Sequence, residues 1–227
     1  MKKQLGLGIL AICTGLTTAG VGFAAENIEV ETQASVGFAG TETPVAIGHV
    51  DPEAPRETDP HAPANLGATP MPLTLDYASR WQFDTQKMSL VDRTYTAKQD
   101  VFAGRAVANH VQVTDQRGQL DGWDLQVRQK TPFVHEKGAE LKGAKLQIDR
   151  VTSKSAVTDT TVLTAKEKMA LNQAFMRLAY AKPGDGYGTT AISLGEVSLH
   201  VPGQMKKLSG NYNSTIVYKL LAAPTGE

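Results

Sequence analysis

The sequence predicts an all-β protein, an antiparallel β-sandwich of the Ig-like or a related kind with long loops. Two observations favour this fold class. Short runs in which apolar and polar residues alternate recur along residues 73–220, and Gly, Asp and Pro fall between the runs as turn residues. Many short strands at this spacing are typical of sandwiches and barrels. Residues 71–227 are expected to hold this domain, since about 155 residues suffice for an ordinary core.

The alternating runs define the expected strands in chain order. Within a run, residues two apart share a face, so one set of side chains points to the core and the other away from it. The expected strands are residues 73–77, 80–83, 94–97, 110–113, 123–127, 144–148, 157–163, 191–194, 197–201 and 214–220. Residues 164–178 depart from this pattern because they are rich in helix formers. They favour a short helix or a loop turn that begins near Thr164.

Residues 1–25 predict a secretory signal peptide. Two basic residues are followed by an apolar stretch and then by small residues up to Ala25. The apolar stretch is too short, and too often interrupted by Gly and Thr, for a membrane-spanning helix. No later apolar run approaches the roughly 20 residues of such a helix, so we expect no membrane span. We expect cleavage after Ala24 or Ala25, and therefore an exported protein.

Residues 26–70 are expected to lie outside the compact domain. Residues 26–38 have the alternation of a short strand, and the segment from there to Pro72 holds seven of the 11 prolines of the chain. A segment so rich in Pro and charged residues cannot build a core, so we interpret it as a Pro-rich extended spacer or a draped loop. His49 and His61 lie in this segment and are expected to be solvated.

Composition excludes several classes of function. The 23 basic residues balance the 23 acidic ones, so nothing favours binding to nucleic acid or to an anionic membrane surface. The single cysteine, Cys13, lies in the leader, so the exported protein has neither a disulfide nor a thiolate. His110 and His200 lie in strand patterns and are expected to be ordinary core or surface residues. Because no motif for metal binding, phosphate binding or catalysis is found, we expect no cofactor, no metal and no enzymatic activity.

The most informative short pattern is an aromatic-x-leucine step. Trp123 and Leu125 lie two apart in one alternating run, and Tyr218 and Leu220 repeat the step near the end of the chain. Burial of a Trp side chain removes roughly 150–250 Å² from water, on the order of 4–6 kcal/mol at most, so Trp123 is expected to be a structural anchor. Two interpretations stay open. Either the steps are facing core strands, with Trp123 and Tyr218 packing across the domain, or they form a surface on which sugar rings stack.

Blocks along most of the exported chain carry a family resemblance. The blocks are Pro72–Ser79, Trp81–Lys87, Thr94–Ala97, Val111–Val113, Gly122–Val127, Val197–Gly203 and Tyr212–Leu220. Together they resemble the WxL-domain cell-surface proteins of low-GC Gram-positive bacteria. One position departs from that family's pattern, because Tyr218 stands where the second signature usually has Trp.

The resemblance implies a secreted, non-catalytic protein that is attached non-covalently to the bacterial cell wall. It further implies that the C-terminal domain binds peptidoglycan and that companion cell-surface proteins assemble with it. The implied signature residues are Trp123, Leu125, Tyr218 and Leu220. The alternative is a surface-complex scaffold or adhesin component that binds companion surface proteins or host molecules. The aromatic candidates for a ligand-facing patch are Trp81, Tyr95 and Tyr187.

Overall fold

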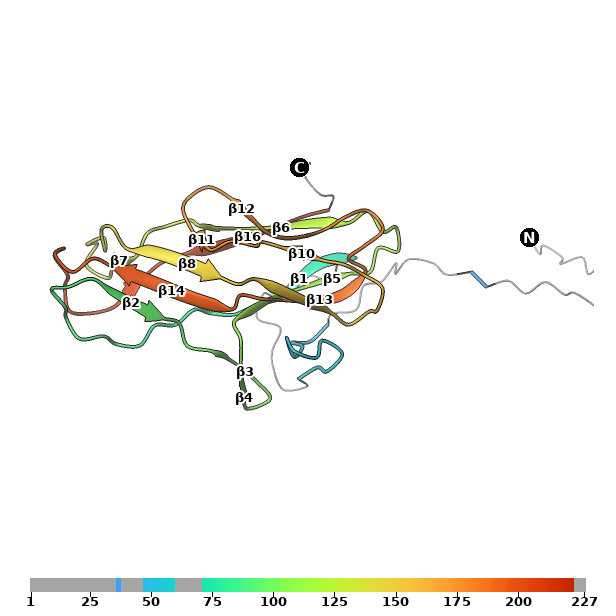
Figure 1. The fold of residues 1–227 in the computed structure, drawn as a ribbon, viewed down its shortest axis with the longest axis horizontal. Coiled ribbons are helices and arrows are strands. Elements are labelled where there is room, and N and C mark those ends of the chain that lie inside the picture. Colours follow the sequence, from blue (N-terminus) through green and yellow to red (C-terminus); the bar gives the residue numbers. More distant parts are fainter. Residues whose placement is uncertain (1–35, 38–46, 60–70, 223–227) are drawn as a thin grey trace, which may run out of the picture. The chain divides into compact units, whose positions relative to one another are not determined.

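The structure, a computed structural model, describes residues 36–37, 47–59 and 71–222 (Figure 1). The chain divides into two units, residues 1–37 and 38–227, and every strand named below belongs to the second. The described residues form strands, turns and loops, and none of them is helical. Over that part of the chain there is accordingly no helix that could cross a membrane.

The strands form two layers, and the first layer consists of two four-stranded antiparallel sheets. In spatial order, one sheet contains β1 (Leu73–Ala78), β5 (His110–Asp115), β13 (Gly188–Ser193) and β9 (Thr152–Ser155). The other contains β11 (Met169–Ala170), β8 (Lys145–Asp149), β14 (Glu196–Val201) and β2 (Arg93–Thr96). The two sheets continue into each other through a pair of neighbouring chain segments. One segment runs from β8 into β9 and the other from β13 into β14. The two segments pair along both halves, β9 with β13 in the first sheet and β8 with β14 in the second.

The junction between these two sheets depends on Arg150 and Gly195. Both have positive φ, 59° and 53° respectively. A Cβ atom on Gly195 would lie only 2.3 Å from the backbone oxygen of Asp149, so this position requires glycine. The local break lets the paired strands change direction while their antiparallel register is kept on both sides.

The second layer is a four-stranded antiparallel sheet with the strand order β10-β12-β6-β16. Its strands are β10 (Leu163–Thr164), β12 (Met176–Ala181), β6 (Trp123–Gln129) and β16 (Ile216–Leu221). Two small pairs complete the fold, β7 (Val134–His135) with β15 (Tyr212–Asn213), and β3 (Asp100–Phe102) with β4 (Arg105–Val107). The predicted fold class, an all-β antiparallel sandwich with long loops, is confirmed.

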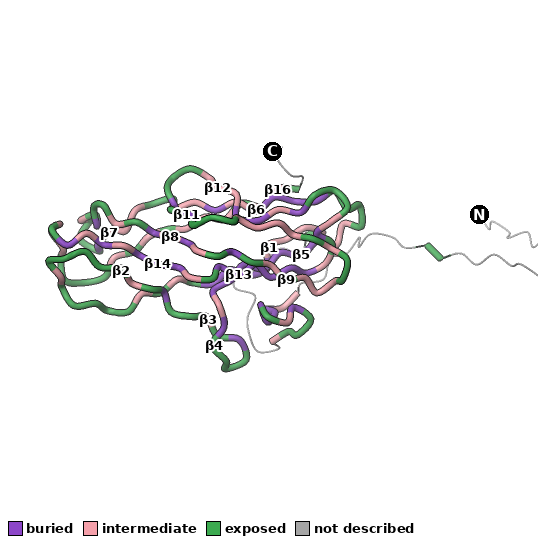
Figure 2. Tube along the Cα trace, viewed as in Figure 1, coloured by how far each residue is buried: buried purple, intermediate pink, exposed green. Residues whose placement is uncertain are grey.

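The core lies between the two layers and follows the alternation read from the sequence. Trp123, Leu125 and Val127 on β6 pack with apolar side chains of the opposite layer, such as Val111 and Val113 on β5. Figure 2 shows how buried positions recur along the central strands, whereas the connecting loops are mostly exposed. Burial of the apolar side-chain set on the core face fixes the register of a strand, because a slip by one residue would turn that set away from the core.

Three segments differ from the sequence-based expectations. Residues 80–83 form no strand, although Trp81 and Phe83 are half-buried against the core, which accounts for the alternating pattern there. Residues 157–163 are loop except for Leu163. Of the two alternatives for residues 164–178, a short helix or a loop turn, the helix is wrong, since this stretch contains the end of β10, β11 and the start of β12 with loop residues between them. Here the ladder between β12 and β6 and the complete burial of Leu178 outweigh helix propensity.

The expectation that His49 is solvated is also wrong. Residues 47–59, which we call the strap, pack on the face of β5 opposite the core. His49 is 2 % exposed, and the backbone N–H of Val50 donates to the side-chain oxygen of Gln112 at 3.0 Å. β5 is therefore buried on both faces, by apolar residues on one side and by the strap on the other. His61 and most of the strand expected at residues 26–38 lie outside the described residues.

Candidate functional site

The two aromatic-x-leucine steps lie on neighbouring strands of one sheet. β6 runs between β12 and β16, and in its pairing with β16 Leu125 stands opposite Leu220 while Val127 stands opposite Tyr218. Trp123 and Leu125 are fully buried, and Tyr218 and Leu220 are half-buried against the same core. The steps are thus adjacent in the second layer and do not face each other across the domain.

Trp123 connects the core to the loop between β12 and β13 by a hydrogen bond. Its indole N–H donates to the backbone oxygen of Gly186 at 3.0 Å, which satisfies the polar atom of a side chain that has no exposed surface. Gly186 has a φ of +80°, and a Cβ atom there would lie 2.3 Å from the Cβ of Ala181 and 2.5 Å from the indole nitrogen. Trp123 therefore offers no surface on which a sugar ring could stack in this structure.

We expect Gly186→Ala to lower the free energy of unfolding by roughly 2–4 kcal/mol. The change adds the strain of a left-handed residue to steric overlap with Trp123 and Ala181. Gly184→Ala is the matched control, because Gly184 also has positive φ but nothing lies within 4 Å of its Cβ position. The control should cost only about 1 kcal/mol. Urea unfolding of the two variants checks the difference, and equal losses would show that the contact with Trp123 is not tight.

A groove with a volume of about 1080 Å³ opens near one end of the domain. Its walls include residues 78–89, which precede β2, and residues 207–214, which precede β16. The chain has two Trp, six Tyr and six Phe residues. Six of these aromatic residues, all half-buried, line the groove: Trp81, Phe83, Tyr95, Phe133, Tyr212 and Tyr218.

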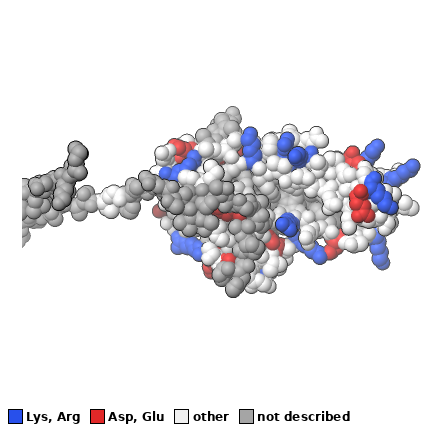
Figure 3. All heavy atoms as spheres, turned by 180° about the vertical axis from the view of Figure 1, so that it is seen from behind, with Lys and Arg blue, Asp and Glu red and all other residues white. Residues whose placement is uncertain are grey.

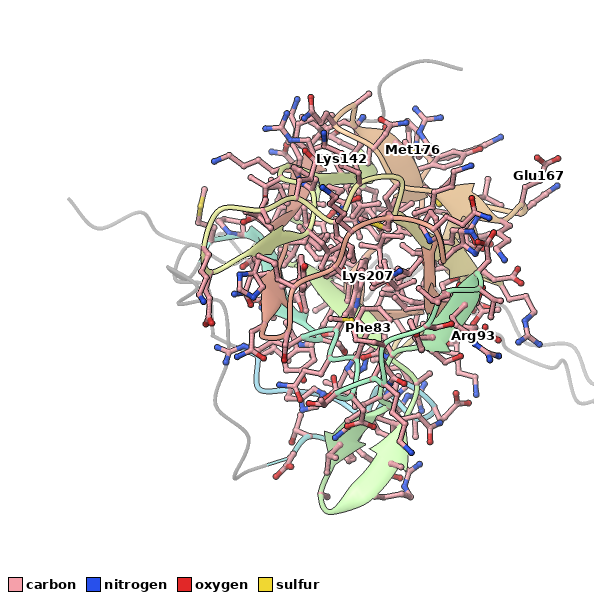
Figure 4. All side chains as sticks on the ribbon, turned by 90° about the vertical axis from the view of Figure 1, so that its left-hand side faces the viewer. Phe83, Arg93, Lys142, Glu167, Met176 and Lys207 are labelled. Atoms are coloured by element: carbon pink, nitrogen blue, oxygen red, sulfur yellow. The ribbon has the colours of Figure 1, made fainter. Side chains whose placement is uncertain are left out.

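Hydrogen bonds hold the two walls of the groove in place. The ammonium group of Lys207 donates to the backbone oxygens of Ser89 at 3.1 Å and of Gly203 at 2.7 Å, and so links the walls. The backbone N–H of Lys98 donates to the backbone oxygen of Gln82 at 2.8 Å. Figure 4 looks onto this end of the domain, with Phe83 and Lys207 from the two walls near its centre. Although residues 79–92 form no strand, they are tied to their surroundings at both ends.

Two polar atoms of the groove lack partners among the residues that the structure describes. They are the indole nitrogen of Trp81 and the hydroxyl oxygen of Tyr218, and both are shielded from solvent. The two rings meet edge to face with their centroids 6.5 Å apart. Burial raises the pKa of the Tyr218 hydroxyl, which therefore stays protonated. An unpaired buried polar group costs about 1–3 kcal/mol, and because both atoms are shielded they are not presented to the groove in this structure.

The structure brings some of the predicted site residues together and separates others. Trp81, Tyr95 and Tyr218 line the groove, whereas Tyr187 is 44 % exposed and lies outside it. Sequence reasoning missed Phe83, Phe133 and Tyr212 as groove residues. They come from three segments that are far apart in the sequence. A single half-buried aromatic residue has no sequence pattern from which its neighbours in the folded protein could be predicted.

The fold and the groove define the chain as a two-layer antiparallel β-sandwich module with one recessed aromatic face. A family model described as "WxL domain surface cell wall-binding" matches residues 25–224, nearly the whole chain. The chain therefore belongs to the WxL domain family of surface cell-wall-binding proteins, a non-enzymatic surface domain family. No curated protein sequence and no solved structure matches the chain significantly.

Proposed function

We propose that this protein is exported, loses residues 1–25 as a signal peptide, and is held at the cell wall by non-covalent binding of peptidoglycan glycan in the aromatic groove. The observation that carries the proposal is the gathering of six half-buried aromatic side chains around one groove. Sugar rings present apolar C–H faces, which pack on aromatic rings, and polar edges, which need hydrogen bonds. Family membership supports attachment to the wall, and the groove supplies the chemistry for a saccharide.

The indole N–H of Trp81 and the hydroxyl of Tyr218 would reach such a ligand only after a rearrangement of the groove, because both are shielded in the structure. Both groups donate hydrogen bonds, and the hydroxyl and acetamido oxygens of wall glycans are acceptors. Charge plays a smaller part, because basic and acidic side chains are interspersed over the face shown in Figure 3 and the chain has no net charge. Binding of this kind should depend weakly on salt, unlike binding to a single-sign polyelectrolyte.

The test is sedimentation of the purified protein, without residues 1–25, with peptidoglycan from which other wall polymers have been stripped. We expect enrichment in the pellet over a soluble control protein of similar size, little loss between 0.05 and about 0.5 M salt, and release when a muramidase solubilises the glycan. Equal amounts of protein and control in the pellet would overturn the proposal.

A second function, docking of a companion surface protein, is favoured by one separate observation. Met88 lines the groove, and Leu90 and Val91 follow this wall directly; the three residues are 60, 86 and 59 % exposed. Exposed apolar residues this close together are typical of protein-facing patches. If this function dominates, retention of the protein on cells will disappear when companion proteins are deleted, and stripped peptidoglycan will bind it poorly.

A further inference from the structure

A cluster of metal-binding residue types lies away from the groove, between the strap and the first layer. His49 comes from the strap, Asp100 begins β3 and His110 begins β5. The two histidines are 2 % and 0 % exposed. One nitrogen of each histidine and one carboxylate oxygen of Asp100 all lie within 4.8 Å of one another. None of these three residues lines the groove, although Ser79, which donates a hydrogen bond to Asp100, does.

Hydrogen bonding fixes which nitrogen of His110 is free to bind. Nδ1 lies 3.0 Å from the backbone oxygen of Ala108, and a carbonyl oxygen only accepts, so Nδ1 carries the proton. Nε2 of His110 is then left with a lone pair and faces Nε2 of His49 at 2.9 Å. Oδ2 of Asp100 lies 3.9 Å from Nδ1 of the same ring, so the carboxylate has to swing toward Nε2 to share an ion with it. A backbone carbonyl that holds the remote nitrogen in this way is the usual support of a metal-binding histidine.

The surrounding side chains hold the other two groups in position. Asp100 accepts hydrogen bonds from the hydroxyl groups of Tyr77, at 2.7 Å, and of Ser79. Although burial alone raises it, these bonds keep the pKa of Asp100 below its ordinary value, so the carboxylate is charged. The ring of Tyr77 stacks on His49 with centroids 3.8 Å apart and an angle of 12° between the planes.

The charge state of the histidines suits a cation. Burial lowers the pKa of His110 to about 4 and lowers the pKa of His49 as well. Both imidazoles are therefore neutral near pH 7, which is the form that binds metal ions. Two neutral imidazoles and a carboxylate are ligands that zinc accepts, and softer thiolate ligands are absent from the described residues because the only cysteine is residue 13.

We propose that His49, His110 and Asp100 form a binding site for a divalent transition-metal ion of the zinc type, with water as a fourth ligand. Zinc–nitrogen bonds of about 2.0–2.1 Å in tetrahedral geometry place two ligand nitrogens about 3.3 Å apart, so the histidine pair has to widen by about 0.4 Å. The two ring planes are 13° apart with their centroids 4.9 Å apart, so each ring also has to turn to aim its lone pair at the ion. The proton on Nε2 of His49 moves to Nδ1 of the same ring, which frees the second lone pair. No net proton is lost.

Such an ion would join the strap to the sandwich, because its ligands come from the strap, β3 and β5. In the structure the strap is held by the bond from Val50 to Gln112 and by the ion pair between Asp51 and Arg105. Metal binding adds bonds that join strap, β3 and β5 directly, and it stabilises only the state in which all three are in place. The site is thus structural, and its loss leaves the aromatic groove intact.

The test uses the protein without residues 1–25, first freed of metal with a chelator and then titrated with Zn²⁺ by calorimetry. We expect one ion per chain. The thermal midpoint should rise by roughly 5–10 °C at a hundredfold excess of Zn²⁺ over Kd. His49→Gln and His110→Gln should each abolish the stoichiometric binding. His200→Gln is the matched control, because His200 also lies near a carboxylate, that of Asp92 at 3.8 Å, but on β14 and outside the cluster.

A spectroscopic measurement keeps the test valid if a histidine variant fails to fold. Co²⁺ in place of Zn²⁺ should give the intense visible absorption of a four-coordinate site in the unaltered protein. A weak spectrum like that of aqueous Co²⁺, the absence of saturable Zn²⁺ binding, or binding that survives His49→Gln would each overturn the proposal.

Discussion

Trp123→Ala is expected to lower the free energy of unfolding by roughly 3–5 kcal/mol, the range measured when large aromatic side chains are removed from packed cores. Trp123 has no exposed surface, and its indole N–H is the partner of the Gly186 backbone oxygen. The substitution therefore leaves a cavity at the end of β6 and also frees the loop between β12 and β13. For a domain of this size the thermal midpoint should fall by roughly 6–20 °C.

Trp123→Phe is the companion variant, because it keeps most of the apolar area and removes the hydrogen bond. It should cost about half as much as the Ala variant. Both variants are followed by calorimetry and by the quenching of tryptophan fluorescence. A midpoint for Trp123→Ala within about 2 °C of the unaltered protein would contradict the burial of this side chain.

Much of the fold was predictable because the core strands obey a local rule. Leu73–Tyr77, Trp123–Val127 and Val197–Val201 alternate clearly in sequence, and all three lie within strands. The burial is less regular than the sequence, because a bulge at Asp76 turns Tyr77 toward His49 of the strap, and the polar residues Asp124 and Ser198 are buried as well. The rule fails where burial has another cause. Residues 80–83 alternate because Trp81 and Phe83 pack against the core without a partner strand.

The strap shows a second limit of sequence reasoning. A Pro-rich, charged segment cannot build a core of its own, and this argument led to the expectation that His49 is solvated. The strap needs no core of its own, because it docks on the core that the strands build. Gln112 on β5 hydrogen-bonds to the backbone of the strap at Gly48 and Val50. The sequence of residues 48–50 contains no pattern that predicts this contact.

The candidate sites could be predicted only in part, since each joins distant segments. Trp81, Tyr95 and Tyr218 were chosen singly, as aromatics of alternating runs or of a signature block, and the structure places them in one groove. The cluster of His49, Asp100 and His110 has no spacing that a metal-binding motif would recognise. Its members meet because the strap crosses β5 where the β3–β4 pair begins.

Trp81→Ala is expected to weaken binding to peptidoglycan by roughly 10–100-fold, as for the central aromatic of a binding surface. Trp81 lies in a segment without a ladder and is half-buried, so its removal should cost only about 1–2 kcal/mol of stability. The effects of the two tryptophans are thus opposite in kind. In this proposal Trp123 supports the fold and Trp81 contacts the ligand, although both pack in the same core cluster.

Sedimentation with peptidoglycan at several protein concentrations, together with thermal unfolding, measures both quantities for Trp81→Ala. Tyr187→Ala is the control, because this aromatic is exposed outside the groove and should change neither. Tyr218→Phe sharpens the result. Removal of a buried hydroxyl that has no partner among the described residues should raise stability by about 1 kcal/mol, and wall binding should stay unchanged because the hydroxyl is shielded from the groove. Unchanged binding in Trp81→Ala would move the glycan site away from this groove, because a ligand seated there contacts this side chain.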